Sequence, residues 1–330
     1  MSLLPFVVLL SALTPHQSHL NTILARAAAL GDTAKVEAEL RAGADINMET
    51  LLGQRPLELA AEYRHLGTVR LLLNHGAWVN SASGFGTPLS WAVLGQNIAI
   101  TRLLLIRGAW PDYGGQTSSP LTLALLCSDD PQRQSSNVSS TFIEILPHTA
   151  HNRRLARLLE KKYEEQEVQF MGVSPKSPKE RHTAGLQVVS LLLEYGADAN
   201  RKSDTGSTPL MSASLAGNAD SARMLIDHGA VVDAKNNSGL TALWNATLSG
   251  SMELVKLLVG KGAAVDAQGD NGSYPLLNAV AGRKAEMVQF LLEHGANPNL
   301  PAKSAETALG IAKMYQDAKI IALLQAAGAK

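Results

Sequence analysis

Short apolar segments recur in pairs along the chain, and their spacing predicts a helical repeat. Examples of the first segment of a pair are Pro56–Ala61 and Pro209–Ala213, and examples of the second are Val69–Leu73 and Leu254–Leu258. Small residues in the first segment allow neighbouring helices to approach closely, and the leucines of the second segment fill the space between units. Each pair therefore predicts two short helices that are joined by a tight turn and share an apolar core.

A Gly-Ala pair closes each of these units at a nearly constant period. The spacings between successive glycines are 33, 32, 88, 33, 33, 33 and 33 residues, for Gly43, Gly76, Gly108, Gly196, Gly229, Gly262, Gly295 and Gly328. A glycine just past a helix supplies the left-handed residue that ends it, and a proline at the first helical position loses no hydrogen bond. The period indicates an array of eight units in a row.

The repeat resembles the ankyrin family, whose units of about 33 residues run from a Thr-Pro-Leu-His start to a Gly-Ala-Asp-x-Asn finish. Matching starts are Thr87–Leu89 and Thr208–Leu210, and matching finishes are Gly43–Asn47, Gly196–Asn200 and Gly295–Asn299. The resemblance covers residues 20–330 apart from one insertion. It implies an all-α fold, an ankyrin-repeat solenoid of eight helix-turn-helix units with a helical insertion in the fourth.

One departure from the family pattern is consistent along the chain. The histidine that follows Pro-Leu in the family is replaced in every unit, by Ala25, Glu58, Ser90, Thr122, Met211, Trp244, Leu277 and Gly310. In the family this histidine usually ties adjacent loops together by hydrogen bonds. The resemblance therefore implies looser loops in this protein.

The 88-residue spacing places an insertion inside the fourth unit and sets the predicted boundaries. These are an apolar N-terminal segment (1–19), units 1–3 with the first helix of unit 4 (20–126), the insertion (127–184) and the remaining units (185–330). Lengthening one turn by this much costs only about 2–3 kcal/mol in loop-closure entropy. Within the insertion, residues 153–171 predict a charged helix whose apolar face either packs on the array or binds a partner.

The apolar run Leu3 to Leu13 leaves the location of the protein open. It is too short to span a bilayer as a helix, so we expect no transmembrane helix. It has the length of the apolar part of an export signal, although nothing basic precedes it and Pro5 interrupts it. We favour a cytoplasmic protein in which this segment covers the edge of the first unit. If the run acts as a signal, the protein is periplasmic or secreted.

Composition narrows the function classes. The 330 residues carry 29 basic and 29 acidic side chains, so a neutral chain has no general attraction to nucleic acid. The lone Cys127 excludes intramolecular disulfides and cysteine-built zinc sites. The recurring histidines, His75, His228 and His294, are interpreted as helix-end residues. Without a nucleophile, phosphate-loop or metal-helix motif, we expect no catalytic, metal or cofactor-binding residues and no small-molecule cofactor.

The scarce aromatic residues mark a candidate binding site. Trp78 and Trp110 take the place of the aspartate that follows Gly-Ala in the family, and Phe85 and Tyr113 lie in the loops that come next. A loop aromatic has little core to fill, so we predict that these four residues form a partner-binding patch. The competing interpretation is that they pack against one another or against the insertion. Trp91 stands at a position typical of a core leucine and is predicted to be buried.

The resemblance implies a non-enzymatic protein–protein interaction module. Its partner, another protein, would dock on the concave face of the array with little change of shape. If residues 3–13 are an export signal, an alternative is a periplasmic inhibitor or immunity protein that neutralises a toxin. A further alternative is an enzyme whose active residues lie in the 127–184 insertion.

Overall fold

The computed structural model describes residues 15–51, 53–84, 86–115, 118–127, 177–302 and 307–330. Within these ranges the chain is all-helical, apart from one isolated bridge between Ser83 and Gly86. The helices are α1 (Pro15–Leu30), α2 (Thr33–Arg41), α3 (Pro56–Glu62), α4 (Leu66–Asn74), α5 (Pro88–Leu94), α6 (Ile98–Ile106), α7 (Pro120–Cys127), α10 (Pro178–Glu194), α11 (Pro209–Ala216), α12 (Ala219–Asp227), α13 (Ala242–Ser249), α14 (Met252–Gly260), α15 (Pro275–Ala281), α16 (Ala285–Glu293), α17 (Ala308–Met314) and α18 (Ala318–Ala326).

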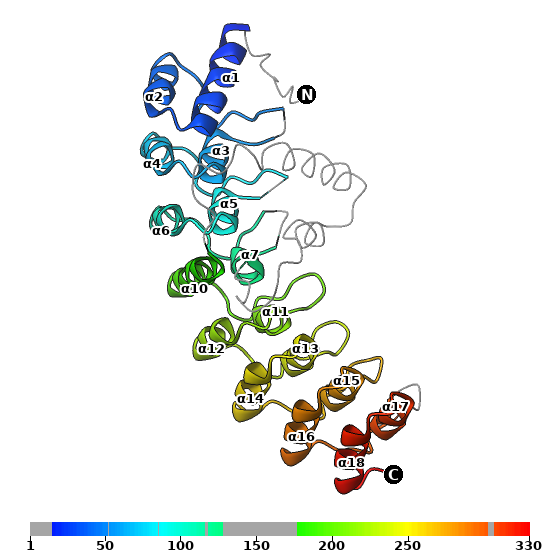
Figure 1. The fold of residues 1–330 in the computed structure, drawn as a ribbon. Coiled ribbons are helices and arrows are strands. Elements are labelled where there is room, and N and C mark those ends of the chain that lie inside the picture. The colour runs from blue at the N-terminus through cyan, green and yellow to red at the C-terminus, as the bar shows by residue number, and fades with distance from the viewer. Residues whose placement is uncertain (1–14, 52, 85, 116–117, 128–176, 303–306) are drawn as a thin grey trace, which may run out of the picture.

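The helices stack in two layers along an elongated, curved array (Figure 1). The helices of a pair, such as α3 and α4, pack against each other, and α3 also packs on the first helices of the pairs before and after it, α1 and α5. The second helices α2, α4, α6, α10 and α12 contact one another in the same order. Each pair therefore buries its apolar faces against its neighbours, which is the arrangement of a solenoid.

The helices on either side of the predicted insertion pack as a pair. α7 contacts α10 although residues 128–177 separate them in the chain, and α7 also packs on α5 and α11. The stacking is therefore unbroken at the position where the sequence spacing changes.

Local sequence signals explain where the helices begin and end. The Thr87 side chain accepts the Ser90 N–H at 3.1 Å, and Thr208 and Thr241 make the same capping bond. A proline after the cap gives up an N–H that has no partner in the first turn of a helix. After the second helix of a pair, a glycine such as Gly76 takes a φ of 87°, a conformation that ends the helix.

The residue just before the second helix of a pair makes one of two kinds of hydrogen bond. In most pairs its side chain caps its own helix, as at Asp32, Asn97, Asn218, Ser251 and Asp317. At His65 and Lys284 the side chain makes no cap bond and reaches the preceding pair instead. His65 Nε2 lies 3.0 Å from the Ala29 oxygen, and Lys284 Nζ donates to the oxygen of Thr247 at 2.7 Å.

The repeating leucines form the core, as predicted. The central leucine of the second helices is 0% exposed in each case described: Leu72, Leu104, Leu192, Leu225, Leu258 and Leu291. The buried apolar cluster runs from Leu20 in α1 to Leu324 in α18. A continuous core of this kind is expected when no unit can bury its own apolar face alone.

All three predicted boundaries fall inside helices, and the one between residues 126 and 127 cuts off the last residue of α7, Cys127. α1 begins at Pro15, so the boundary between residues 19 and 20 divides a helix. α10 begins at Pro178, so residues 178–184, predicted to belong to the insertion, are helical and continuous with the fourth pair. The reason is a strong local helix start: Ser177 and Glu180 form a reciprocal capping box around Pro178. The predicted segments 3–13 and 153–171 lie outside the described residues.

A ladder of hydrogen bonds joins the loops between pairs. Four residues after each loop glycine stands an asparagine or aspartate, whose side-chain oxygen accepts a backbone N–H two residues after the next loop glycine. The bonds run from Trp78 to Asn47, Trp110 to Asn80, Asp198 to Asp112, Val231 to Asn200, Ala264 to Asp233, Asn297 to Asp266 and Lys330 to Asn299, at 2.8–3.0 Å. One backbone N–H of each of these loops is thereby satisfied by the neighbouring pair.

The first pair obtains the same contacts from its own helix. Asn21 of α1 accepts the Asp45 N–H at 2.9 Å, and Gln17 donates to the Gly43 oxygen at 2.7 Å. In the next loops, Asn80 both accepts the N–H of Trp110 and donates to the oxygen of Gly108. The N-terminal part of α1 thus takes the place that a preceding loop has elsewhere in the array.

A second ladder joins the loops of the C-terminal pairs, where looser loops were predicted. Lys202 donates to the Lys235 oxygen at 3.0 Å, and Lys235 donates to the Gln268 oxygen at 3.4 Å. Gln268 in turn donates to the oxygen of Pro301 at 2.9 Å. Lysine and glutamine side chains therefore supply ties between loops that lack the family's histidine.

Candidate protein-binding surface

Trp78 and Trp110 occupy equivalent positions at the base of successive loops. Their backbone N–H groups donate to Asn47 and Asn80, at 2.9 and 2.8 Å. The indole side chains point away from the core and are 59% and 60% exposed. The loop ladder therefore holds two large apolar side chains at the surface of adjacent pairs.

A turn brings Tyr113 against Trp110. The Tyr113 N–H donates to the Trp110 oxygen at 3.2 Å, and Pro111 at the second position favours this turn by restricting φ. The two ring centroids are 5.6 Å apart with an interplanar angle of 66°, an edge-to-face pair. Tyr113 is 37% exposed, so both rings remain accessible.

The sequence also singled out two other aromatic residues of this region, Phe85 and Trp91. Phe85, the fourth residue of the predicted patch, lies outside the described residues. Trp91 in α5 is 4% exposed, which confirms its predicted place in the core. Among the residues predicted for the patch, the structure therefore brings Trp110 and Tyr113 together and places Trp78 one pair away.

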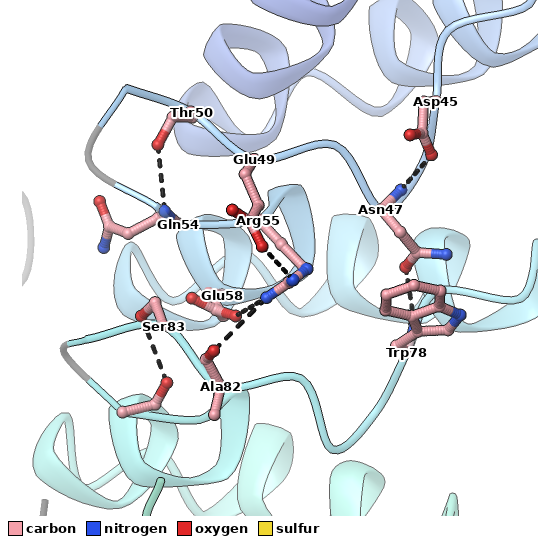
Figure 2. A network of polar contacts seen from close by, with 11 residues as sticks. Asp45, Asn47, Glu49, Thr50, Gln54, Arg55, Glu58, Trp78, Ala82 and Ser83 are labelled. Atoms are coloured by element: carbon pink, nitrogen blue, oxygen red, sulfur yellow. Dashed lines mark hydrogen bonds and ion pairs between the residues drawn. The ribbon is translucent and has the colours of Figure 1, made fainter. Parts of the chain in front are cut away.

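Arg55 connects Trp78 to two carboxylates (Figure 2). Its guanidinium carbon lies 5.7 Å from the centroid of the Trp78 ring, within the range of a cation–π interaction. The same guanidinium pairs with Glu49, lies 3.7 Å from Glu58 Oε1 and donates to the Ala82 oxygen at 3.5 Å. Arg55 is therefore held in one orientation against the indole.

Glu58 is a buried carboxyl on α3, with a side chain that is 0% exposed. Burial raises the pKa of Glu58 above its usual 4.5, while the nearby hydroxyls of Ser83 and Ser81 and the charge of Arg55 act in the opposite direction. Because a buried charge without its partner is strongly unfavourable, Glu58 and Arg55 depend on each other.

The Trp78 side chain lies at the base of its loop. Figure 2 shows Trp78 beside Asn47, well away from Thr50 and Ser83 near the tip. We use the name aromatic surface for Trp78, Trp110, Tyr113 and Arg55. Docking on the concave face of the array, expected from the resemblance, stays a prediction.

The Arg55–Glu58 pair was not predicted from the sequence. Arg55 stands where Thr87 and Thr208 stand in other pairs, and Glu58 replaces the family's histidine. The available signal was that two departures of opposite charge lie three residues apart at the start of one helix. Residues with that spacing are neighbours on a helix surface.

The recurring histidines serve helix ends, as predicted. The Nδ1 atoms of His75, His228 and His294 lie 3.0, 2.8 and 2.8 Å from the carbonyl oxygen of the residue four positions earlier. Among the described residues, no group of three or more His, Cys, Asp or Glu side chains could hold a metal ion. In the same ranges, none of the helices is both long and apolar enough to cross a bilayer.

Stacked helix pairs with hydrogen-bonded loops define a helical repeat protein. Residues 24–114, 182–269 and 243–330 match the family model for ankyrin repeats (3 copies). These matches cover well over half of the chain, so the protein belongs to the ankyrin-repeat family. The repeats of this family are generally protein–protein interaction modules and typically non-enzymatic. No curated protein matches the sequence.

Proposed function

We propose that the protein is a non-enzymatic interaction module that binds a partner protein through the aromatic surface. The observation that carries the proposal is the exposure of Trp78 and Trp110, 59% and 60%, at equivalent positions of adjacent loops. Tryptophan, tyrosine and arginine supply a large share of the binding energy at protein interfaces. An exposed indole adds little to the stability of the array, so its position is better explained by recognition.

The backbone beneath these side chains supports binding with a small ordering cost. The Trp78 and Trp110 N–H groups are bonded to the preceding loop, and the Tyr113 N–H is bonded within its turn. Arg55 is held by Glu49 and by the oxygen of Ala82. A surface already fixed in one shape loses less conformational entropy when a partner docks.

The test is affinity capture from the native host with the full chain as bait. Wild type is compared with a Trp78→Ala/Trp110→Ala variant, and everything retained is identified by mass spectrometry. We expect one stoichiometric protein to be retained by wild type and reduced about tenfold or more in the variant, because truncating central aromatic anchors costs upwards of about 1–2 kcal/mol.

The matched control changes exposed apolar residues elsewhere on the array. Val231 and Leu248 are 55% and 47% exposed, and Val231 stands at the same loop position as the two tryptophans. A Val231→Ala/Leu248→Ala variant should retain the partner like wild type. Equal retention by the tryptophan variant and wild type would sink the proposal.

A further inference from the structure

The loop ladder places four side chains in one row along the array. Asp45, Trp78, Trp110 and Asp198 each follow a Gly-Ala pair, and each donates its backbone N–H to the ladder. Two exposed indoles therefore stand between two exposed aspartates. Neighbouring helices pack about 8–10 Å apart, which sets the approximate spacing along the row.

Trp78 indicates which chemical group this row accepts. The guanidinium of Arg55 lies 5.7 Å from the Trp78 ring centroid and is paired with the carboxylate of Glu49. A guanidinium is favourable there because the face of an aromatic ring and a carboxylate both attract positive charge.

Trp110 has the same position one pair later, but within the described part of the chain the equivalent loop position carries no cation. Arg55 and Thr87 each precede the proline that begins a first helix, and each lies 23 residues before its tryptophan. The Thr87 hydroxyl is uncharged, accepts the N–H of Ser90 and lies 3.4 Å from the oxygen of Tyr113. The place that Arg55 takes beside Trp78 therefore receives only a capping threonine beside Trp110.

Carboxylates lie next to Trp110. Asp112 follows it by two residues in the same turn, and Asp198 is the next member of the row. The Asp112 carboxylate accepts the Asp198 N–H at 3.0 Å, which brings these two residues together. The hydrogen bonds that these two carboxylates accept come from uncharged backbone N–H groups.

Two of the neighbouring basic side chains, those of Arg107 and Lys202, form hydrogen bonds with other groups. A third, Arg201, marks the end of this acidic stretch. Arg107 donates to Asn74 of the preceding pair at 2.8 Å, and Lys202 donates to the Lys235 oxygen at 3.0 Å. Arg201 follows Asp198 in the next turn and limits the acidic stretch on that side.

We infer that Trp110 and Tyr113, together with Asp112 and Asp198, bind an arginine or lysine side chain of the partner protein. This inference rests on the proposed function and names the chemistry of the partner, a protein segment with a basic side chain. The cation packs on the exposed indole and is balanced by the two carboxylates, as Arg55 is balanced by Glu49 beside Trp78.

The test uses synthetic peptides as probes and the full chain as receptor. The peptides alternate glycine with arginine, lysine or glutamate, and binding is followed by the indole N–H signals in NMR spectra, assigned with Trp→Phe variants. We expect the arginine and lysine peptides to shift the Trp110 signal in a saturable manner, and the glutamate peptide to leave it unchanged. A Trp110 signal that is unmoved by the basic peptides, or moved equally by the acidic one, overturns the inference.

Charge-neutralising variants that keep the ladder provide the second readout. Asparagine already accepts the ladder bond at positions 47, 80 and 200, so Asp112→Asn removes a charge and retains the contact. Asp112→Asn and Asp198→Asn should each weaken the arginine peptide about two- to fivefold. The matched changes Asp233→Asn and Asp266→Asn should leave its affinity unchanged, and equal weakening by both sets contradicts a site at Trp110.

The inference and the proposed function fail in different ways. If basic peptides do not bind while Trp78→Ala/Trp110→Ala still loses the natural partner, the interaction function stands and the inference is wrong. If basic peptides bind at Trp110 while the natural partner is captured equally by the tryptophan variant, the cation site stands and the proposed function is wrong.

Discussion

The carboxylate of Asp112 accepts the backbone N–H of Asp198 at 3.0 Å, across 86 residues of sequence. Asp233 makes the same contact with Ala264 across only 31 residues. The ladder therefore follows spatial neighbours, and its register passes over the additional residues of the fourth pair. This single contact shows how an interrupted repeat keeps its loops aligned.

Replacing Asp112 with alanine should destabilise the array, because the N–H of Asp198 then loses its acceptor. We expect the free energy of unfolding to fall by about 0.5–1.5 kcal/mol, measured by urea denaturation. Asp112→Asn should stay close to wild type, since asparagine makes this bond in neighbouring loops. If the two variants lose the same amount, the hydrogen bond is not the stabilising contact.

The exposed and buried tryptophans should differ sharply in their effect on stability. Trp110→Ala should change the free energy of unfolding by no more than about 1 kcal/mol, because its side chain is 60% exposed. Trp91→Ala should cost about 3–5 kcal/mol through the cavity left in the core. Thermal or urea unfolding of both variants checks this, and a large loss in Trp110→Ala would mean that the indole serves packing.

Glu58 should make stability depend on pH in a defined direction. Its pKa is raised in the folded state, so its favourable contribution is complete below the unfolded value of 4.5 and is lost as pH rises through the folded pKa. Glu58→Gln should therefore gain stability relative to wild type as pH increases from about 4 to 7. Denaturation at several pH values measures this difference. Removing an exposed carboxyl with Glu286→Gln is the control, and parallel pH profiles for the two variants would contradict the prediction.

Two loop glycines should separate backbone strain from steric contact. Gly229 has a φ of 84° with nothing in the described chain within 4 Å of an added Cβ, so Gly229→Ala should cost about 1–2 kcal/mol. Gly206 has a φ of 73°, and an added Cβ would lie 2.8 Å from the Asn237 nitrogen. Gly206→Ala should therefore cost more than Gly229→Ala in urea unfolding. Equal losses would show that the Gly206–Asn237 approach relaxes freely.

Tyr274 should stabilise the loops through its buried hydroxyl. It stands where other first helices have a capping threonine, is 0% exposed, and donates to the oxygen of Leu300 in the next loop. Tyr274→Phe should cost about 1 kcal/mol at neutral pH. Burial raises the pKa of Tyr274 from 10.0 to about 12, so the wild-type advantage should disappear as pH rises through that interval. An advantage that persists at pH 12 in denaturation experiments contradicts this account.

The helix pairs could be predicted from the sequence because their signals are local. Prolines at helix starts and glycines at helix ends act within a few residues, and Leu72 and its equivalents repeat with the same period. The start of α10 was missed because the predicted boundary after residue 184 was set by the spacing of the repeat. The capping box of Ser177 with Glu180 was present in the sequence and starts the helix earlier.

The details of the candidate surface depend on contacts between pairs, which sequence spacing does not specify. The aromatic residues could be singled out because they replace a polar residue of the family. The orientation of Arg55 over Trp78 requires the loop of one pair to lie beside the next. The partner of Asp112 lies 86 residues away, where no period of 33 would place it. Such relationships follow from the packed array and from no single unit.

His65 and Lys284 have a consequence for the way the array unfolds. In a solenoid, stability is the sum of what each unit contributes alone and what each junction contributes. Asp32 or Asn97 strengthens its own helix, whereas His65 and Lys284 forgo that cap and bond to the preceding pair. We therefore expect these two bonds to strengthen the coupling across their junctions at the expense of the helices that they leave uncapped. The pairs on either side should then unfold together, so that cooperativity differs along an otherwise regular repeat.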